Sequence, residues 1–358
     1  MRRNIAFFLA ALLLAPVSLP AQTGPEAEEK RLAEIQAKRA RGEQPTAEEQ
    51  EFYKQVQSRR REGFARNNPP RESTGAIPLT DLGTGAYKGE PGGLYPDGKN
   101  ELPAAHRNAG LAIAKAIAPI DGKIGMLSIG MSNTTQEFQV FMKLASADPR
   151  INPHLVIVDG AQGGQAADTT ANPNAKYWDV VAQRLQAAGV SPQQVQVAWL
   201  KQAIIAPRQP FPAEAKRLQS YLAQTLLNAK ARYPNLKIVY LSSRIYAGYA
   251  LTPLNPEPHA YEDAFAVKWL IADQIAGNPE LNFDSAKGVV RAPWIAWGPY
   301  LWSDGVKPRG DGLVYLRGDL EERDGTHPSM GGREKVARLL LDFLRSSPTS
   351  RPWFLKPN

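Results

Sequence analysis

The chain has 358 residues, of which 43% are hydrophobic and 22% are charged, a balance that fits one large domain with an extension. It has no cysteine, which excludes disulfides, thiolate metal sites and cysteine nucleophiles, and its four histidines leave few candidates for imidazole chemistry. The formal charge of +8 is mild for this length. Basic and aromatic residues do not alternate as they do on a nucleic-acid-binding surface, so we expect no nucleic-acid partner.

The first 21 residues have the pattern of a secretory signal peptide. Arg2 and Arg3 precede an apolar run over residues 5–14, and small residues lead to a cleavage site expected near Ala21. This run is too short for a comfortable membrane span, and no later segment is apolar enough to be one. The sequence therefore predicts an exported protein, periplasmic or extracellular, with no membrane span.

Residues 22–72 are rich in Glu, Arg, Lys, Gln and Ala and predict a charged helical extension. Two helical pieces are expected, divided over residues 42–45. The second opens with Thr46-Ala47-Glu48-Glu49, the pattern of a capping box. A solvated extension and a tether or partner helix both fit this composition.

From residue 104 onward, amphipathic segments and short apolar runs alternate. Helices are expected at 104–120, 134–148, 175–190, 213–234, 260–277 and 330–346. Strands are expected at 123–130, 154–161, 195–200, 236–243 and 312–316. Strict alternation with continuous apolar strands predicts an α/β domain over residues 73–358, with a doubly wound, mostly parallel five-stranded sheet and helices on both faces. Ligands bind such sheets at the carboxyl ends of the strands.

The first strand ends in a row of polar side chains, Ser132-Asn133-Thr134-Thr135. A hydroxyl at this position can cap the following helix. It can also act as a nucleophile, because the free amides and dipole of a helix start stabilise negative charge. The second strand leads to three glycines within five residues, among them Gly164, where a turn or an oxyanion donor is expected. The third ends in Lys201-Gln202, a polar pair that either meets water or contacts a ligand.

The segment "RDGTHPSMGG" gives the strongest signal. Asp324 and His327 lie three residues apart in a loop, and the proline after His327 keeps this histidine out of the following helix. Asp324 can therefore reach Nδ1–H of His327, which would fix the tautomer of the imidazole and raise its basicity.

Together these segments resemble the SGNH, or GDSL-like, hydrolases over roughly residues 122–344. "LSIGMSNTTQEF" corresponds to their first block, with Met131 where the family has Asp, and "DGAQGGQAA" corresponds to the second. "DGTHPS" matches the last block, whereas "WLKQA" stands where the family has G-x-N-D. The resemblance implies a flavodoxin-like three-layer fold and a serine esterase with Ser132 as nucleophile, His327 as base and Asp324 as its orienting carboxylate. It also implies an oxyanion donor at Gly164, and no metal or cofactor. The third block does not match, and Gln202, as an amide donor, or Lys201, as a cationic donor, are the candidates for the donor that it supplies in the family.

The expected substrate is an O-acyl ester, with O-acetyl favoured, on a carbohydrate. Aromatic residues in "RAPWIAWGPYLW" and "IYAGYA" can stack on sugar rings or can belong to the core. Asn133, Lys201, Arg244 and Trp297 are the candidate substrate contacts. Two alternatives stay open at this point. One is a non-catalytic glycan-binding or envelope protein on the same fold, and the other is an O-acyltransferase that uses the same acyl-enzyme.

Overall fold

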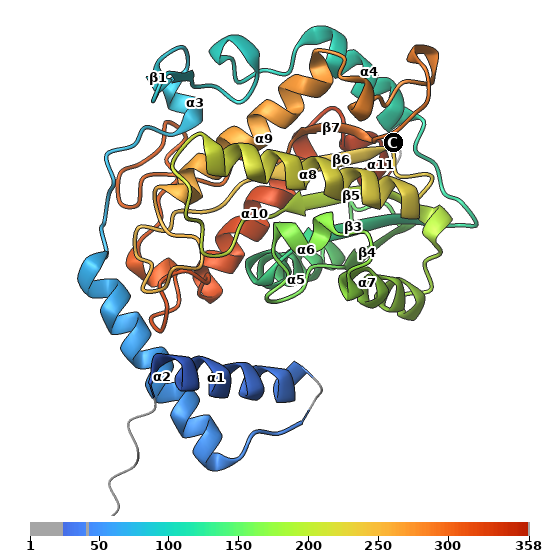
Figure 1. Ribbon diagram of the computed structural model, residues 1–358. Helices are drawn as coiled ribbons and strands as arrows, with labels where there is room; N and C mark the ends of the chain where they lie inside the picture. The colour runs from blue at the N-terminus through green and yellow to red at the C-terminus, as the bar shows by residue number, and fades with distance from the viewer. Residues whose placement is uncertain (1–23, 41–42, 357–358) are drawn as a thin grey trace, which may run out of the picture. The chain divides into compact units, whose positions relative to one another are not determined.

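The computed structural model describes residues 24–40 and 43–356 (Figure 1). The predicted signal peptide at residues 1–21 lies outside the described residues. Two compact units meet in the chain between Arg60 and Arg61, whereas the sequence-based boundary of the extension lies at residue 72. Within the described ranges, no helix combines the length and apolar character needed to cross a membrane.

The N-terminal unit consists of α1 (Pro25–Ala40) and most of α2 (Ala47–Asn67). The predicted capping box is confirmed, since Thr46 N–H donates to Glu49 Oε2 at 2.8 Å and Glu49 N–H donates to Thr46 Oγ1 at 3.2 Å. Leu32, Ile35 and Val56 are buried between the two helices. This unit therefore has a small apolar contact of its own, and charged residues cover the rest of it.

The larger unit is built on a five-stranded sheet, which confirms the predicted fold class. All neighbouring strands are parallel, and their order is β4-β3-β5-β6-β7. The strands are β3 (Ile124–Gly130), β4 (Leu155–Asp159), β5 (Val195–Lys201), β6 (Ile238–Ser242) and β7 (Trp294–Trp297). This order puts the topological switch between β3 and β5, where doubly wound folds bind their ligands. A separate two-stranded hairpin joins β1 (Ala86–Tyr87) and β2 (Glu90–Pro91).

The prediction of the fifth strand was wrong in its position. The segment 312–316 forms no strand, and the edge strand is β7, whose residues pair with 238–241 of β6. Gly312 has a positive φ of 87°, which breaks an extended conformation at the start of the predicted strand. The segment "WIAW" was interpreted only as an aromatic cluster, although a short apolar run between two prolines also fits a buried strand.

Helices cover both faces of the sheet and connect its parallel strands (Figure 1). α5 packs beside α10, and α8 packs beside α9 and α6. The helices of this unit are α3 (Leu79–Leu82), α4 (Ala104–Lys115), α5 (Ser132–Ser146), α6 (Ala167–Ala171), α7 (Lys176–Ala187), α8 (Ala213–Arg232), α9 (His259–Ile275), α10 (Met330–Ser346) and α11 (Arg351–Phe354). Short 3₁₀ turns occur at 96–98, 192–194, 279–281, 285–287 and 317–319.

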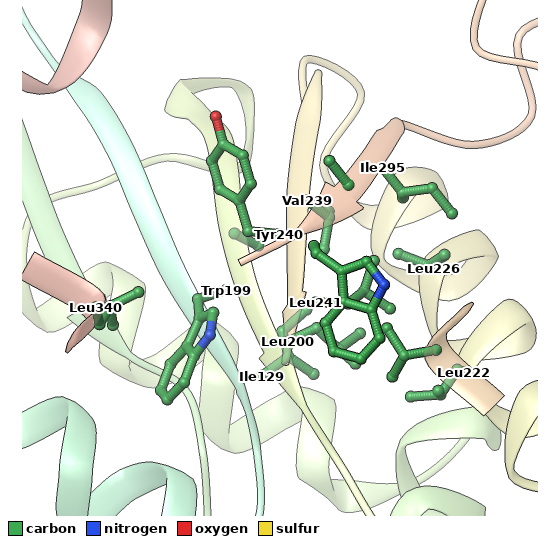
Figure 2. Close-up of a cluster of buried hydrophobic side chains, with 14 of the residues drawn as sticks. Ile129, Trp199, Leu200, Leu222, Leu226, Val239, Tyr240, Leu241, Ile295 and Leu340 are labelled. Carbon is green, nitrogen blue, oxygen red and sulfur yellow. The ribbon is translucent and has the colours of Figure 1, made fainter. Parts of the chain in front are cut away.

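The core lies on both sides of the central strands, because successive side chains of a strand point to opposite faces. Figure 2 shows Trp199 and Tyr240 on one side together with Leu340 of α10, and Leu200 and Leu241 on the side of α8. All five side chains are almost completely buried. This double-sided packing fixes the strand ends, and so the site, in a rigid frame.

Candidate active site

The four polar residues that follow β3 contact three different parts of the fold: the loop of His327, the end of β5 and the end of β4. Ser132 Oγ lies 2.8 Å from Nε2 of His327, and Asn133 Nδ2 donates to the carbonyl oxygen of Thr326 at 3.0 Å. Thr134 Oγ1 donates to the carbonyl oxygen of Lys201 at 2.8 Å, and Thr135 Oγ1 donates to a carboxylate oxygen of Asp159. Met131 is the N-cap of α5, and no side chain caps this helix. Helix capping therefore does not explain the row.

Ser132, His327 and Asp324 form a continuous line of hydrogen bonds. Besides the contact of Ser132 with Nε2, the imidazole of His327 places Nδ1 2.8 Å from Oδ2 of Asp324. The side chain of His327 is 16% exposed and that of Asp324 is 12% exposed. The line thus runs from a sheltered carboxylate to a hydroxyl that solvent or a ligand can reach.

The charge of Asp324 fixes which imidazole nitrogen carries the proton. Burial favours the neutral acid, but hydrogen bonds from the ring and the backbone amide of His327 and from the amide of Thr326 outweigh it and lower the pKa of Asp324 to about 2. An ionised carboxylate only accepts hydrogen bonds. Nδ1 therefore donates to Asp324, and Nε2 of the neutral ring accepts the hydroxyl proton of Ser132.

The loop that carries Asp324 and His327 is anchored to its surroundings at several points. Leu251 N–H donates to the carbonyl oxygen of Asp324, and Glu321 N–H donates to that of His327, both at 2.8 Å. Gly325 between them has a φ of 59°, and a Cβ there would lie 1.9 Å from the carbonyl oxygen of Tyr249. Only glycine fits this turn, so the glycine of the D-x-x-H segment allows the loop to lie close to its neighbour.

Asp159, at the end of β4, is a positioning residue that the sequence analysis did not single out. Its Oδ1 accepts a hydrogen bond of 2.6 Å from Ser128 of β3, and its Oδ2 accepts one from Thr135 in the first turn of α5. These contacts tie two strands to the helix that begins with Ser132. The available signal was a carboxylate at a strand end facing a row of hydroxyl residues.

The glycine turn after β4 lies beside Ser132. Gly163 is the nearer glycine, because a Cβ built there would be 3.9 Å from Cβ of Ser132, while Gly164 has a φ of 75° and open space around its Cβ position. Among the described residues, none accepts a hydrogen bond from the amides of Ser132, Gly163 or Gly164. These free N–H groups are the available donors next to the hydroxyl of Ser132.

The side chain of Gln202 is hydrogen-bonded to the end of this turn and to α6. It is 2% exposed, and its Nε2 donates to the carbonyl oxygen of Gln165 at 3.1 Å and to Oγ1 of Thr170 at 3.3 Å. The amide group that was expected to contact an oxyanion therefore connects β5 with the glycine-rich turn. In this arrangement it has no donor left for a ligand.

Three further candidate substrate contacts lie in the interior. Lys201 is 1% exposed and forms an ion pair with Glu137 of α5. Burial lowers the pKa of Lys201 to about 8 and raises that of Glu137, while the contact between the two opposes both shifts. Trp297 is 3% exposed and donates from Nε1 to the carbonyl oxygen of Leu94 at 2.7 Å. Arg244 is 2% exposed, and its Nε and Nη2 have no hydrogen-bond partner among the described residues.

The aromatic residues that were considered for sugar stacking are also in the interior. All are at most 5% exposed, and they pack on one another or donate to backbone carbonyls: Tyr246, Tyr249, Trp294, Trp297, Tyr300 and Trp302. Of the two readings, core packing is the one that the structure supports. Asn133, also 2% exposed, joins α5 to the histidine loop through its bond to Thr326.

Comparison with known proteins adds little to this geometry. No protein family and no curated protein matches the chain. Among solved structures, it is similar to the periplasmic domain of a lipopolysaccharide acetyltransferase from Salmonella ser. Paratyphi A. The identity is 12% and the TM-score 0.33, over 68% of this chain and 88% of that chain. Any functional conclusion therefore rests on the residues of the site itself.

Proposed function

We propose that the protein is a serine esterase of the SGNH type that acts on O-acyl esters. The observation that carries this proposal is the line of hydrogen bonds from Asp324 through His327 to Ser132, with contacts of 2.8 Å on both sides of the imidazole. The free amides beside Ser132 give it further support. A hydroxyl, a base with a fixed tautomer and free backbone donors are the parts that acyl transfer to serine requires.

In the proposed reaction, Nε2 of His327 takes the proton of Ser132 as Oγ bonds to the carbonyl carbon of the ester. The amides of Ser132 and of Gly163 or Gly164 stabilise the negative oxygen of the tetrahedral intermediate. The bond to the alcohol oxygen then breaks, and the alcohol leaves with the proton from His327. Water attacks the acyl-serine, gives its proton to His327, and the acid leaves as Ser132 regains a proton.

Acyl transfer to a second alcohol would use the same intermediate, and only the acceptor would differ. Export to the periplasm or the medium is part of the proposal and rests on the pattern of residues 1–21. O-acetyl groups fit the setting, since an exported esterase meets acylated polysaccharide.

Labelling with a fluorophosphonate probe tests the proposal, with hydrolysis of p-nitrophenyl acetate measured in parallel. We expect the native protein to be labelled, and Ser132→Ala and His327→Ala to lose both labelling and turnover. Ser146→Ala is the matched control, because this serine lies at the other end of α5 and its hydroxyl is exposed. Product analysis with an added sugar alcohol then separates hydrolysis from transfer.

A native protein that takes up no label and hydrolyses no ester would contradict the proposal. Equal labelling of the native protein and Ser132→Ala would show that the reactive group lies elsewhere. In either case, direct measurement of glycan binding becomes the next experiment, because a non-catalytic binding protein is the remaining alternative.

A further inference from the structure

A hollow of about 630 Å³ begins at the glycine turn beside Ser132. Its volume lies within the range of about 300–1,000 Å³ that is typical of small-molecule sites. It is lined by the segment after β4, the segment after β5 and one side of α8: Gly164, Ala166, Asp168, Thr169, Ile204, Ile205, Ala206, Arg208, Gln209, Arg217 and Tyr221. Gly164 is part of its wall and follows Gly163, whose Cβ position lies 3.9 Å from Cβ of Ser132, so the hollow opens at the turn that contacts Ser132.

The two segments that line the hollow are joined to each other. Ala167 N–H donates to the carbonyl oxygen of Ala203 at 3.0 Å, and Gln202 donates to Gln165 and Thr170. Neutral side chains and backbone groups make these contacts inside the fold. The wall is therefore built before a ligand arrives, and its charged side chains are not needed to hold it together.

Some of the charged side chains that line the hollow have no partner within the protein. Arg208 and Asp168 are exposed, and neither side chain makes a hydrogen bond or ion pair with another described residue. Arg217 donates from Nη2 to Glu214, while its Nε is buried without a partner. The charges of Arg208 and Asp168 therefore remain free to bind a ligand, whereas the charge of Arg217 is paired with the carboxylate of Glu214.

The rest of the wall combines the polar side chains of Thr169 and Gln209 with apolar surface. Ile204, Ile205 and Ala206 contribute aliphatic surface, and the ring of Tyr221 stacks on no other aromatic ring of the described chain. A sugar has hydroxyl groups that both donate and accept, and an apolar face of C–H groups. Guanidinium donors, a carboxylate acceptor and an aromatic ring match these features together. An aliphatic alcohol has one hydroxyl and would make fewer hydrogen bonds with these groups than a sugar does.

We infer that this hollow binds the sugar half of the substrate, and that Arg208 and Asp168 are its specificity-determining residues. The inference rests on the proposed esterase function and gives it a substrate class, an O-acylated neutral sugar. A neutral sugar is favoured over an anionic one because the charges of Arg208 and Asp168 cancel. The acyl carbonyl then lies at Ser132, while the alcohol oxygen that leaves belongs to the sugar in the hollow.

The test compares kcat/KM for two soluble esters, 6-O-acetylglucose and n-butyl acetate, in the full mature chain. We expect the native enzyme to prefer the sugar ester. The ratio of the two kcat/KM values should fall about tenfold in Arg208→Ala and in Asp168→Ala, as each loses a charge-assisted hydrogen bond to a hydroxyl. Arg107→Ala is the control and keeps the native ratio, because this arginine is exposed on α4 and its side chain makes no hydrogen bond or ion pair with a described residue.

An unchanged ratio in both variants, with native melting temperatures, would overturn the inference while leaving the esterase intact. A fall in Arg208→Ala that appears only with acetylated glucuronic acid would replace the neutral sugar by an anionic one and also overturn it. Failure of the esterase proposal looks different, because then the native enzyme hydrolyses neither ester and takes up no fluorophosphonate.

Discussion

Two polar side chains of α5 each contact a polar residue from another part of the fold, but one contact is accessible to solvent and the other is buried. Ser132, in the first turn, meets His327 in a place that solvent reaches. Glu137, a little more than one turn later, meets Lys201 where both side chains are at most 1% exposed. Both groups combine residues from a strand end or loop with residues of the same helix. Only the first can contact a substrate.

The difference follows from which side of the helix each residue occupies. Residues 132 and 137 are five positions apart, which turns the second side chain well away from the first. Glu137 therefore points toward the sheet and needs Lys201, because a buried carboxylate without a partner is strongly unfavourable. A polar residue at a strand end can therefore contact a ligand only if no neighbouring helix packs over its side chain.

The largest expected effect is a difference in kcat between variants of two hydroxyl residues in the first turn of α5. Ser132→Ala should reduce kcat for p-nitrophenyl acetate by a factor on the order of 10⁶, as loss of a serine nucleophile does in other triads. Thr134→Val, two residues on, removes a buried hydroxyl that only donates to the carbonyl of Lys201. It should cost about 1 kcal/mol of stability and keep most of the activity. Similar losses of kcat in both variants would contradict the distinction.

Asp324→Asn should lower kcat by a factor of about 10⁴, because the amide no longer fixes the tautomer that leaves Nε2 free to accept a proton. Fluorophosphonate labelling of Ser132 should slow in parallel. The neighbouring Arg323→Ala serves as the control, since its Nε lies 3.5 Å from Asp324 and its side chain is 65% exposed. Unchanged activity in Asp324→Asn would mean that His327 is oriented by the loop backbone alone.

Breaking the buried ion pair of Lys201 and Glu137 should reduce stability. Lys201→Met leaves Glu137 without a partner and should lower the free energy of unfolding by about 3–5 kcal/mol, measured by urea denaturation. Adding Glu137→Leu should recover most of this loss, because no buried charge is then left unpaired. Arg338→Ala breaks an exposed pair with Glu334 and should cost less than about 1 kcal/mol. A small effect of Lys201→Met would show that solvent reaches this pair.

The fold and the three residues of the proposed triad followed from local patterns. Four of the five strands are continuous apolar runs whose positions the sequence predicted, and a histidine three residues after an aspartate in a proline-containing loop is a local signal. The edge strand β7 was missed because "WIAW" is as suggestive of an aromatic surface as of a strand. Its pairing with β6 depends on contacts between distant parts of the chain.

The assignments of Lys201, Gln202 and Trp297 depended on burial, which a single sequence does not specify. Each follows or belongs to a strand, where a polar or aromatic residue can meet either solvent or the next layer of helices. Lys201 meets Glu137, Gln202 meets the glycine turn, and Trp297 meets the backbone at Leu94. The free wall of the hollow, with Arg208 and Asp168, was missed because its two segments are about 40 residues apart and carry no motif.

A smaller effect than the loss of the buried ion pair is the pH dependence of stability that Asp324 contributes. Its pKa is lowered from 3.8 to about 2 in the folded protein, so the folded state binds this proton less readily than the unfolded state. The stabilisation is complete above pH 4 to 5 and is lost as the pH falls through the folded pKa. It amounts to about 2 kcal/mol for a side chain that is mostly buried.

Urea denaturation at pH 5, 3 and 2 should therefore show that the stability advantage of the native protein over Asp324→Asn decreases by about that amount. Asp179→Asn, at an exposed carboxylate on α7, should run parallel to the native protein over the same range. A constant difference between the native protein and Asp324→Asn would mean that the bonds from His327 and Thr326 do not stabilise the charge of Asp324, and the tautomer argument for His327 would lose its basis.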